Sequence, residues 1–465
     1  LTVVVGGAAF NRLSAAGALA CFPEIDAVVC GEGELPLSHL VQHHVGEGRP
    51  IEKLPPAGGI VRRGDPAPPS GGPSFYQLEN LDHLPVPDFD DYFAALAGLG
   101  PGKRFFPTLP VEVSRGCWWQ RESAAGDAGG CEFCNLNLQW QGYRSKSPGR
   151  AVSEVDRLTR RHRLLALALV DNVLPRDSGA ELLSGLAGVK RDLSIFAEIR
   201  ATTPFAELAL MRRAGMLRVQ VGIEALSTRL LRKLRKGATA IQNLEIMKHC
   251  EALGIVNLSN LILHFPTSDE EDVAETLAAM EFTGPFRPPK PVGFWLGLGS
   301  PAWRHAEALG MRRVGNHPDW GRNFPASVFG RLPLMIQAYR GGAGRQRRLW
   351  RPVRDRLAAW TNAYEDLNRR APAEPILGFR DGGDFMIIRE RRAGGEAVTH
   401  RLEGASRRIY LFCGRHRSRR RILAAFSDLP ADRVTAFLDR MTAQKLMFAE
   451  GGRFLSLAVP VRTAD

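Results

Sequence analysis

The chain has 465 residues, which is too many for one ordinary hydrophobic core, so we expect two or three domains. Its composition is 44% hydrophobic and 24% charged, which is typical of a globular protein. No apolar run approaches the ~20 residues that span a bilayer, and no signal-peptide pattern is visible. These observations exclude a membrane protein and predict a cytoplasmic one. The net charge of +13 would allow a nucleic-acid partner, but the arginines are spread along the chain apart from one run at 415–421, which we interpret as a solvated helix face.

Residues 1–50 are predicted to form half of an open α/β sheet. The opening LTVVVGG indicates a buried strand that ends in a turn, and a helix over 15–21, a strand over 26–29 and a helix over 37–45 follow. Because residue 1 already lies within a strand, we expect further residues upstream in the natural protein. Residues 51–104 are rich in proline and glycine and are predicted to form a linker.

Residues 105–305 alternate between predicted strands and helices. The strands are expected over 111–116, 164–173, 194–201, 218–225, 255–265 and 292–299, and the helices over 151–162, 178–189, 204–214, 227–235, 240–253 and 269–281. Each strand is a short apolar run of the kind that is buried on both faces of a parallel sheet. Six such units in series predict an α/β fold in which the sheet curls into a partial (β/α)6 barrel similar to a TIM barrel.

Residues 330–465 are predicted to form a separate small α+β domain. Helices are expected over 331–340 and 348–369, a hairpin over FRDGGDFMIIRERR and EAVTHRLEG, and short helices over 408–413, 418–427 and 431–443. Two strands on either side of the Gly-Gly at 451–452 complete the segment. Helices followed by a two-stranded wing indicate a winged-helix-like domain.

Three of the seven cysteines lie within RGCWWQRESAAGDAGGCEFCNLN (115–137), at a spacing of C-x13-C-x2-C. Cys117 follows the first expected strand of the partial barrel, at the end of the sheet where such folds place their chemistry, and Cys131 and Cys134 form a pair that suits zinc or an iron–sulfur cluster. The sequence has no second C-x2-C pair to complete a structural zinc site with these cysteines. Three thiolates can instead hold three irons of a cubane and leave the fourth open. A zinc- and nucleic-acid-binding module is the alternative.

This arrangement, with Phe133 just before the last cysteine, resembles the radical S-adenosylmethionine (SAM) enzymes. The common spacing there is C-x3-C-x2-C, and closing the longer first loop costs only about 1.3 kcal/mol more. The segments VVVGGAAF (3–10), FAEIRA (196–201), QVGIEALSTRLLRKLRKGATAIQN (220–243) and RFLSLAVP (453–460) narrow the resemblance to cobalamin-domain-containing radical SAM C-methyltransferases. These enzymes mature ribosomally synthesised peptides (RiPPs), as in bacteriocin biosynthesis. Their front domain is a Rossmann-like cobalamin fold, of which 1–50 would be the second half.

The resemblance implies cofactors, partners and a reaction. Cys117, Cys131 and Cys134 would bind a [4Fe–4S] cluster, SAM would bind the open iron with Phe133 near its adenine, and cobalamin would carry a methyl group. The partners would be a precursor peptide and an external electron donor, and the reaction would be methyl transfer to an unactivated carbon. Cobalamin-independent epimerisation or cross-linking of a peptide is the alternative, because the front domain is incomplete. No individual catalytic residue is predicted.

Polar residues at the ends of the second and third strands are candidates for cofactor binding. Asp171 and Asn172 would meet the amino end of SAM, although Asp-Asn before a proline is also ordinary turn chemistry. Glu198 and Arg200 are two apart in a strand, so their side chains share a face. If that face is the interior, the two charges could serve as partners for each other, or they could both face the cofactor.

The fourth and fifth strands supply the remaining candidates. Gly222 and Glu224 lie at the end of QVGIEA, where glycine would let the backbone approach the cofactor and the carboxylate would suit a ribose hydroxyl. Asn260 is a polar residue in an apolar run, so it either hydrogen-bonds within the partial barrel or contacts the ligand.

Overall fold

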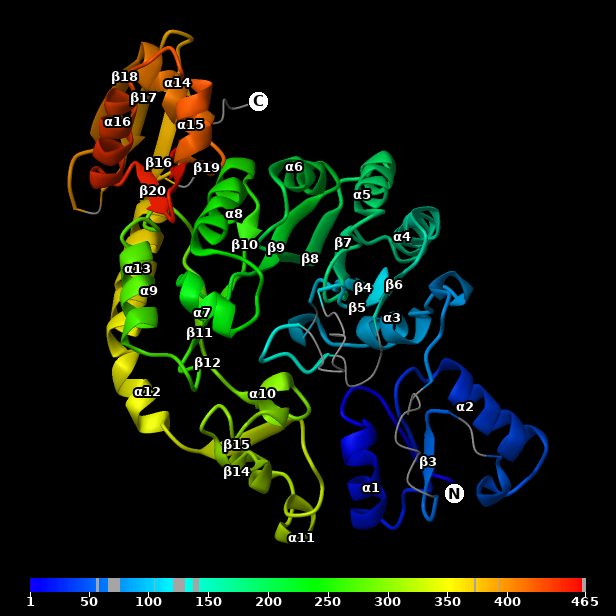
Figure 1. Ribbon diagram of the computed structural model, residues 1–465. Coiled ribbons are helices and arrows are strands. Elements are labelled where there is room, and N and C mark those ends of the chain that lie inside the picture. The colour runs from blue at the N-terminus through cyan, green and yellow to red at the C-terminus, as the bar shows by residue number, and fades with distance from the viewer. Residues whose placement is uncertain are drawn as a thin grey trace.

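The computed structural model describes residues 1–55, 58–65, 76–103, 105–119, 130–136, 142–371, 374–392 and 394–461. The chain runs from a small α/β unit (blue), through a central parallel sheet flanked by helices (cyan to green), to a C-terminal domain (orange and red) at the opposite corner of the molecule (Figure 1). Among the described residues, no helix is both long and apolar enough to cross a membrane.

The front unit is a three-stranded sheet with helices. Its elements are β1 (Val4–Val5), α1 (Arg12–Cys21), β2 (Ala27–Val29), α2 (Glu34–Val41) and β3 (Ile60–Arg62), in the strand order β1-β2-β3. Helix α1 begins earlier than expected because the Asn11 side chain accepts from the Leu13 amide and Ser14 completes a capping box. The expected linker is wrong in part, because β3 pairs antiparallel with β2 and so belongs to this sheet.

A parallel sheet forms the centre of the molecule. Its strands are β4 (Leu109–Val111), β7 (Ala166–Leu169), β8 (Ser194–Arg200), β9 (Met216–Gly222) and β10 (Val256–Asn257), in the order β10-β9-β8-β7-β4, and β11 (Asn260–Leu263) pairs in parallel with β12 (Lys290–Gly293). A bridge between Glu224 and Leu261 connects the two sets. Ile195, Ala197 and Ile199 on β8 point into the core, which places Glu198 on the other face.

Helices α4 (Pro148–His162), α5 (Gly179–Gly188), α6 (Phe205–Arg213), α7 (Thr228–Lys233), α8 (Ala240–Leu253) and α9 (Glu270–Met280) connect these strands. Figure 1 shows α4, α5, α6 and α8 along one side of the sheet. Local signals set their ends: Thr239 and Gln242 form a capping box at the start of α8, and Gly254 ends it with a φ of 60°. The strands therefore end in loops on a single edge of the sheet.

The first expected strand of this sheet, 111–116, is divided in two. Strand β4 pairs in parallel with β7, whereas β5 (Ser114–Gly116) turns away and pairs antiparallel with β6 (Tyr143–Ser145). The division occurs because the Asp171 carboxylate accepts the Val113 amide, which ends the ladder between β4 and β7. Strands β5 and β6 thus bracket the segment that carries the cysteines.

The segment after the parallel sheet departs from expectation in two places. The expected strand 292–299 is divided between β12 and β13 (Leu296–Gly297), and β13 pairs with β15 (Ile336–Arg340), which also pairs with β14 (Arg312–Asn316). The helix expected over 331–340 is wrong, because Pro333 interrupts it and β15 occupies its second half. Short helices α10 (Pro301–Arg304) and α11 (Ala326–Phe329) lie between the strands.

The C-terminal domain begins with α12 (Ala343–Leu349) and the long α13 (Arg351–Arg370). It continues with β16 (Leu377–Asp381), β17 (Phe385–Glu390), β18 (Val398–Glu403), α14 (Gly404–Phe412), β19 (Arg417–Ser418), α15 (Arg419–Ala425), α16 (Ala431–Ala443), β20 (Met447–Glu450), β21 (Arg453–Ser456) and β22 (Val459–Pro460). Strands β20 and β21 pair antiparallel on either side of Gly451 and Gly452, both with positive φ. The expected two-stranded wing is wrong in its strand number, because β19 also pairs with β21 and makes a three-stranded sheet.

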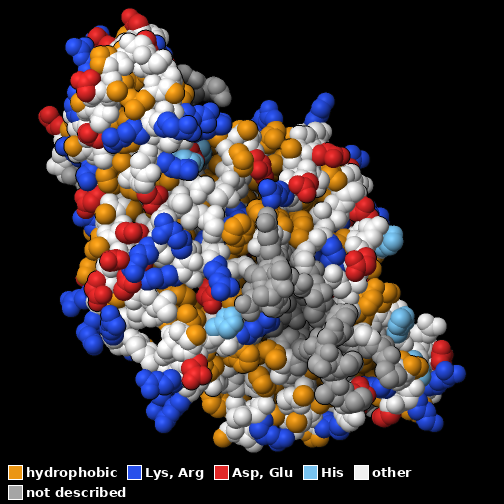
Figure 2. Space-filling view, viewed as in Figure 1, with side chains coloured by type: hydrophobic (Ala, Val, Ile, Leu, Met, Phe, Trp, Pro, Cys, Tyr) orange, Lys and Arg blue, Asp and Glu red, His pale blue; other side chains and the backbone are white. Residues whose placement is uncertain are grey.

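The arginine run at 415–421 spans the start of α15. Arg417 lies over the ring of Phe412 at 5.2 Å and Arg419 lies over the ring of Phe454 at 5.5 Å, so these side chains are partly packed rather than fully solvated. Figure 2 shows basic and acidic side chains interspersed over most of the visible face, with basic ones gathered where the C-terminal domain meets the sheet.

Candidate active site

The cysteine segment is fastened to the ends of the parallel strands by two tryptophans. Trp118 donates its indole N–H to the carbonyl of Leu174 at 3.1 Å, and Trp119 donates to the carbonyl of Arg235 at 3.0 Å. Trp119 fits only because Gly237 has no side chain, since a Cβ there would lie 2.0 Å from the indole ring. Cys117 is therefore held at the edge of the sheet where the strands end.

The three thiols lie within electrostatic reach of one another. Burial raises the pKa of Cys131, although the positive charges of Lys236 and Arg200 lower it, and burial raises the pKa of Cys134 to about 12, with further contributions from Cys131 and Cys117. None of the three is in a disulfide. Deprotonation of such buried thiols requires a positive partner, which a metal centre supplies.

The donor set fits a cubane. Within the described ranges, no three His, Cys, Asp or Glu side chains are grouped so that they could hold a single metal ion. In a [4Fe–4S] cluster each thiolate binds its own iron, so the sulfur atoms need not converge on one point. Three half-buried thiols beside two cationic side chains match that requirement, and a [4Fe–4S] cluster bound by these three thiols would keep one iron without a ligand from them.

Lys236, which the sequence analysis missed, is central to the site. Its Nζ donates to Glu224 Oε1 at 3.0 Å and lies 5.8 Å from the centre of the Phe133 ring. Burial alone would lower the pKa of Lys236, but the charge of Glu224 and the nearby Cys131 raise it above its usual value. A Cβ on Gly222 would lie 2.6 Å from Nζ, so this glycine makes room for the pair. Lys236 is one of several cations in LLRKLRKG, and nothing in that pattern distinguishes it.

Glu224 is held in a conformation that few non-glycine residues adopt. Its φ is 62°, and its backbone is fixed on both sides by hydrogen bonds to β11, from Glu224 N to the Asn260 carbonyl at 3.1 Å and from Ile262 N to the Glu224 carbonyl at 2.8 Å. Such strain is typical of residues whose side chain is aimed at a ligand. It directs the Glu224 carboxylate toward Lys236 and the cysteines.

Arg200 lies between the cysteines and the tryptophans. It is 8% exposed, donates to the Lys236 carbonyl at 2.5 Å, hydrogen-bonds to Cys131 and stacks on Trp119 at 4.1 Å. The suggested ion pair between Glu198 and Arg200 is wrong: among the described contacts, Arg200 uses other partners. Burial and the nearby charge of Glu224 raise the pKa of Glu198.

Asp171 forms hydrogen bonds with nearby residues of the fold. It is 3% exposed and accepts hydrogen bonds from the Val113 amide at 3.1 Å and from the Ser114 hydroxyl at 2.6 Å. Burial raises its pKa to about 7. These contacts join β5 to the end of β7 and support the turn alternative, while Asn172 lies half-buried in the bend that follows. A cofactor role for either residue stays a prediction.

The front unit docks beside the cysteines through the acidic turn after β2. Arg115 on β5 pairs with Glu32 at 3.1 Å and with Glu34 at 2.6 Å, and Arg144 on β6 pairs with Glu32 at 2.5 Å. Burial would raise the pKa of Glu34, but the hydrogen bond from Arg115 holds it below its usual value. The carboxyl end of β2 therefore meets the hairpin that brackets the cysteine segment.

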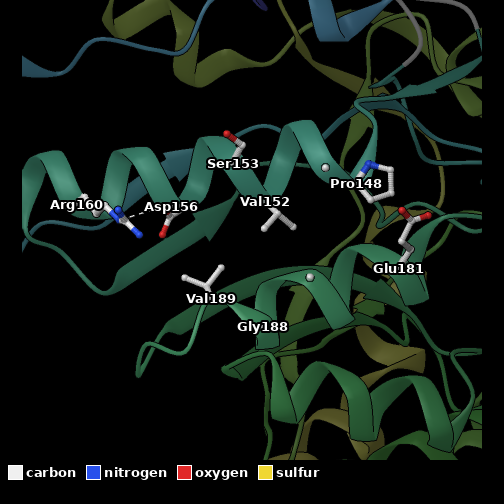
Figure 3. A pocket seen from close by; sticks show the side chains of 10 residues that line it. Pro148, Val152, Ser153, Asp156, Arg160, Glu181, Gly188 and Val189 are labelled. Carbon is white, nitrogen blue, oxygen red and sulfur yellow. Dashed lines mark ion pairs between the residues drawn. The ribbon is translucent and has the colours of Figure 1, made fainter.

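One cavity lies beside this region and another lies between two helices. One, of about 550 Å³, is lined by Trp118, Trp119, Arg176 and Arg200, and so adjoins the cysteines. Another, of about 570 Å³, lies between α4 and α5, and Figure 3 shows Val152 and Glu181 facing it, with the ion pair of Asp156 and Arg160 at one end. No predicted site residue lines this second cavity, which is a groove between packed helices.

Comparison with protein families identifies the central part of the chain. Residues 113–280 match the Radical SAM superfamily, and this range contains all three cysteines together with Arg200, Glu224 and Lys236. The chain therefore contains a radical SAM domain. Such a domain uses a [4Fe–4S] cluster and SAM, and it needs an electron donor.

Two curated relatives are named as methyl-transferring enzymes. The chain is 27% identical over 267 residues to an uncharacterised methyltransferase of Pyrococcus horikoshii, covering 55% of this chain and 52% of that protein. It is 27% identical over 252 residues to the hopanoid C-3 methylase of Methylococcus capsulatus, covering 51% and 42%. A third relative, 28% identical over 262 residues and covering 55% and 44%, is the anaerobic magnesium-protoporphyrin IX monomethyl ester cyclase of Rubrivivax gelatinosus. The chain spans about half the length of these relatives or less.

Solved structures share the fold. The cobalamin-dependent radical SAM enzyme OxsB with aqua-cobalamin bound has a TM-score of 0.54 and 16% identity, covering 72% of this chain and 51% of that one. The radical SAM methyltransferase TsrM from Kitasatospora setae, with tryptophan substrate and a SAM analogue bound, has a TM-score of 0.54 and 17% identity, covering 77% and 71%. At this identity the likeness shows the mixed α/β radical SAM fold.

Proposed function

We propose that the chain is a radical SAM enzyme that methylates carbon, with cobalamin as the methyl carrier and a peptide as the substrate. One observation carries the radical chemistry: three thiols lie beside Arg200 and Lys236 at the ends of parallel strands, within the range that matches the superfamily. The relatives named as methylases support the methyl transfer.

The residues of the chain have distinct tasks in this proposal. Cys117, Cys131 and Cys134 hold the cluster, which when bound supplies the electron that cleaves SAM and starts the radical chemistry. Arg200 and Lys236 offset the negative charge of the thiolates. Glu224, fixed in position by its backbone and by Lys236, is placed to accept hydrogen bonds from the ribose hydroxyls of SAM.

In this proposal, the aromatic side chains of the cysteine segment exclude water from the active site. Trp118 and Trp119 cover Arg200, and Phe133 lies against Lys236, so apolar rings surround the charged groups. A dry site strengthens electrostatic interactions and protects reactive species from side reactions. Phe133 is proposed to contact the adenine ring.

The placement of the front unit supports the choice of cobalamin. Its sheet abuts the cysteine hairpin through Glu32, Arg115 and Arg144, so a molecule bound at the carboxyl ends of β1 and β2 would face the site. In open α/β sheets, ligands bind at the carboxyl ends of the strands. Cobalamin-independent epimerisation or cross-linking of a peptide is the second candidate.

The test is methylation of added cobalamin by the reconstituted protein. The chain is loaded anaerobically with iron and sulfide and then mixed with cobalamin, SAM and a strong reductant. The proposal expects S-adenosylhomocysteine together with a change in cobalamin absorbance, and deoxyadenosine as the separate product of radical cleavage. Deoxyadenosine without S-adenosylhomocysteine would reject the methyl transfer and favour the second candidate.

A further inference from the structure

A cleft of about 420 Å³ lies where the C-terminal domain meets the parallel sheet. We call it the interdomain cleft. One wall is formed by the turn after β8, residues 201–205, and by α8, and the other wall by residues 415–418, Arg421 of α15 and Arg453 of β21. Figure 2 shows basic side chains gathered at this junction. The cleft therefore lies between two parts of the chain that are distant in sequence.

Four arginines line the interdomain cleft, and none of them forms an ion pair with another described residue. They are Arg415, Arg417, Arg421 and Arg453. Other arginines of the same domain do have carboxylate partners: Arg407 pairs with Asp381 at 2.6 Å and Arg419 with Asp439 at 4.0 Å. Positive charges that are gathered in a concave region without counter-ions attract anions.

Among the described lining residues, the one carboxylate is already engaged. Glu245 of α8 accepts a hydrogen bond from the His416 amide at 2.8 Å and lies 2.8 Å from Nδ1 of its ring. Arg453 lies 3.1 Å from Nε2 of the same ring, and because a guanidinium can only donate, the ring proton is assigned to Nδ1. Burial would raise the pKa of Glu245, but the hydrogen bond from His416 holds it below its usual value. Glu245 thus orients His416 and does not neutralise the arginines.

Aromatic rings hold two of the arginines in place. Arg415 is exposed, but its guanidinium lies over the ring of Phe205 at 6.0 Å, and the buried His249 packs edge-on against the same ring at 4.9 Å. Arg417 is half-buried and lies over the ring of Phe412 at 5.2 Å. A stacked guanidinium keeps most of its N–H groups available, and less conformational entropy is lost when an anion binds to a side chain that is already positioned.

The interdomain cleft adjoins the cavity beside the cysteines. Thr202, Thr203 and Pro204 line both. The cavity beside the cysteines is also lined by Trp118 and Trp119, which fasten the cysteine segment to the sheet. A chain-like ligand that occupies both would therefore extend from the C-terminal domain to the candidate active site.

The other lining residues favour a peptide over a nucleic acid. Single-stranded nucleic acids bind by stacking successive bases on aromatic rings. Phe205 is the one phenylalanine, tyrosine or tryptophan in the described lining, and Arg415 and His249 already pack against it. Gln242 and Ile246 instead add an amide and an apolar side chain, which complement a polypeptide. Among the side chains of a peptide, carboxylates are the partners that guanidinium groups bind most strongly.

We propose that the interdomain cleft binds an acidic segment of a peptide, whose carboxylates pair with Arg415, Arg417, Arg421 and Arg453. The proposal rests on the proposed function in one respect, the peptide substrate. It makes the C-terminal domain the part of the chain that selects the substrate by charge, while the adjoining cavity leads toward the cysteines.

Calorimetric binding to the reconstituted protein tests the proposal with three probes: a capped tetraglutamate peptide, a capped tetraglutamine peptide and a short oligouridylate. We expect the tetraglutamate to bind one to one and the tetraglutamine, which has the same shape without the charge, to bind at least about tenfold more weakly. Absence of tetraglutamate binding, or equal affinity for the two peptides, overturns the proposal. Tighter binding of the oligouridylate than of tetraglutamate also overturns it and assigns the cleft to a nucleic acid.

A matched pair of variants separates the cleft from the general positive charge of the protein. Arg415→Gln combined with Arg421→Gln should lower the affinity for tetraglutamate about tenfold and leave Tm and iron content as in the wild type. Arg347→Gln combined with Arg348→Gln removes the same charge from exposed positions on α12 and should change the affinity less than twofold. The single change Arg421→Glu provides a second test if the double variant fails to fold, and it should weaken binding by a similar factor. An equal loss of affinity in the cleft and α12 variants, or unchanged binding in Arg421→Glu, overturns the proposal.

The result is independent of the test of the proposed function. A chain that methylates cobalamin but does not distinguish tetraglutamate from tetraglutamine contradicts the interdomain cleft alone. A chain that binds tetraglutamate through these arginines but forms no S-adenosylhomocysteine contradicts the methyltransferase alone.

Discussion

Arg200 is the residue on which the contacts of the candidate active site converge. It touches Cys131, the Lys236 carbonyl and both tryptophans while it is almost fully buried. A buried cation is expensive unless an anion lies near it, and the groups that favour the charge of Arg200 are first Cys131 and Cys117 and then Glu224. Its position therefore indicates a role in setting the charge balance of the cluster.

Replacing Arg200 by Gln should lower the reduction potential of the cluster. The reduced cluster carries one more negative charge than the oxidised cluster, and we take the positive charge of Arg200 to stabilise it by about 1 kcal/mol. Loss of that stabilisation shifts the midpoint potential by on the order of 50 mV to more negative values. A redox titration followed by electron paramagnetic resonance measures this shift. Arg200→Lys keeps the charge and should stay close to the wild type, and a potential that does not move in Arg200→Gln would contradict the role.

Asp171→Ala tests whether this carboxylate supports the fold. Because it accepts from Val113 and Ser114 in a buried position, its loss should lower the free energy of unfolding by about 2–4 kcal/mol. Urea denaturation measures this loss, and titration with SAM provides the comparison. Wild-type stability combined with weakened SAM binding would show that the cofactor interpretation is the correct one.

His249 should make the fold sensitive to acid. Burial and the charge of Lys248 lower its pKa to about 4, from about 6.5 in an unfolded chain. Between these values the unfolded state binds a proton that the folded state does not, so stability is lost as the pH falls from 6.5 to 4, by about 3 kcal/mol at most.

Urea denaturation at several pH values between 7 and 4 measures that loss. His249→Phe should flatten the dependence, whereas His39→Phe, at an exposed position on α2, should leave the slope as it is in the wild type. An equal slope in His249→Phe would show that other groups cause the acid sensitivity.

At the residue scale, the sequence singled out residues whose spacing or position in a strand is unusual. The cysteines stand out by their spacing, and Gly222 and Glu224 stand out at the end of a strand. Lys236 could not be recognised, since its role depends on how the loop after α7 folds back onto Gly222. The contacts of Arg200 could not be predicted either, because its partners Trp119 and Lys236 lie far from it along the chain.

Among the elements, the helices and central strands followed from hydrophobic periodicity and capping residues. The divided strand β4–β5 did not, because its break depends on Asp171, which lies far along the chain. The helix predicted over 331–340 is wrong for a similar reason. Its apolar residues have a helical spacing but contribute to β15, which is stabilised by pairing with β13 and β14. Pairing between distant segments decides such cases, and a local pattern does not contain it.

Gly237 links a single turn to the whole cysteine segment. A valine there would require a left-handed backbone, with a φ of 69°, and would displace Trp119, at a cost of about 1–3 kcal/mol from the backbone alone. We expect Gly237→Val to incorporate less iron on reconstitution and to melt at a lower temperature. Gly188→Ala is the control, since a Cβ there meets open space. Full iron content in Gly237→Val would show that Trp119 does not position the segment.

In the whole molecule, parts that are distant in sequence complete one another. Ala15, Ala18 and Val28 of the front unit form one core cluster with Val328 and Leu332, and α8 packs against β20, β21 and β22 of the C-terminal domain. The order of strands and helices predicted three regions, but it could not predict these contacts. As a result, the front unit is held to the cysteine hairpin by ion pairs and to the segment around Val328 and Leu332 by packing.

The most direct measurement is the iron content and deoxyadenosine production of Cys131→Ala after anaerobic reconstitution. Our account predicts about four irons per chain and SAM cleavage in the wild type, with both lost in the variant and both retained in Cys21→Ala, which changes a cysteine of α1 away from the site. A Cys131→Ala chain that keeps its iron and still releases deoxyadenosine would contradict the claim that these three thiols hold the cluster.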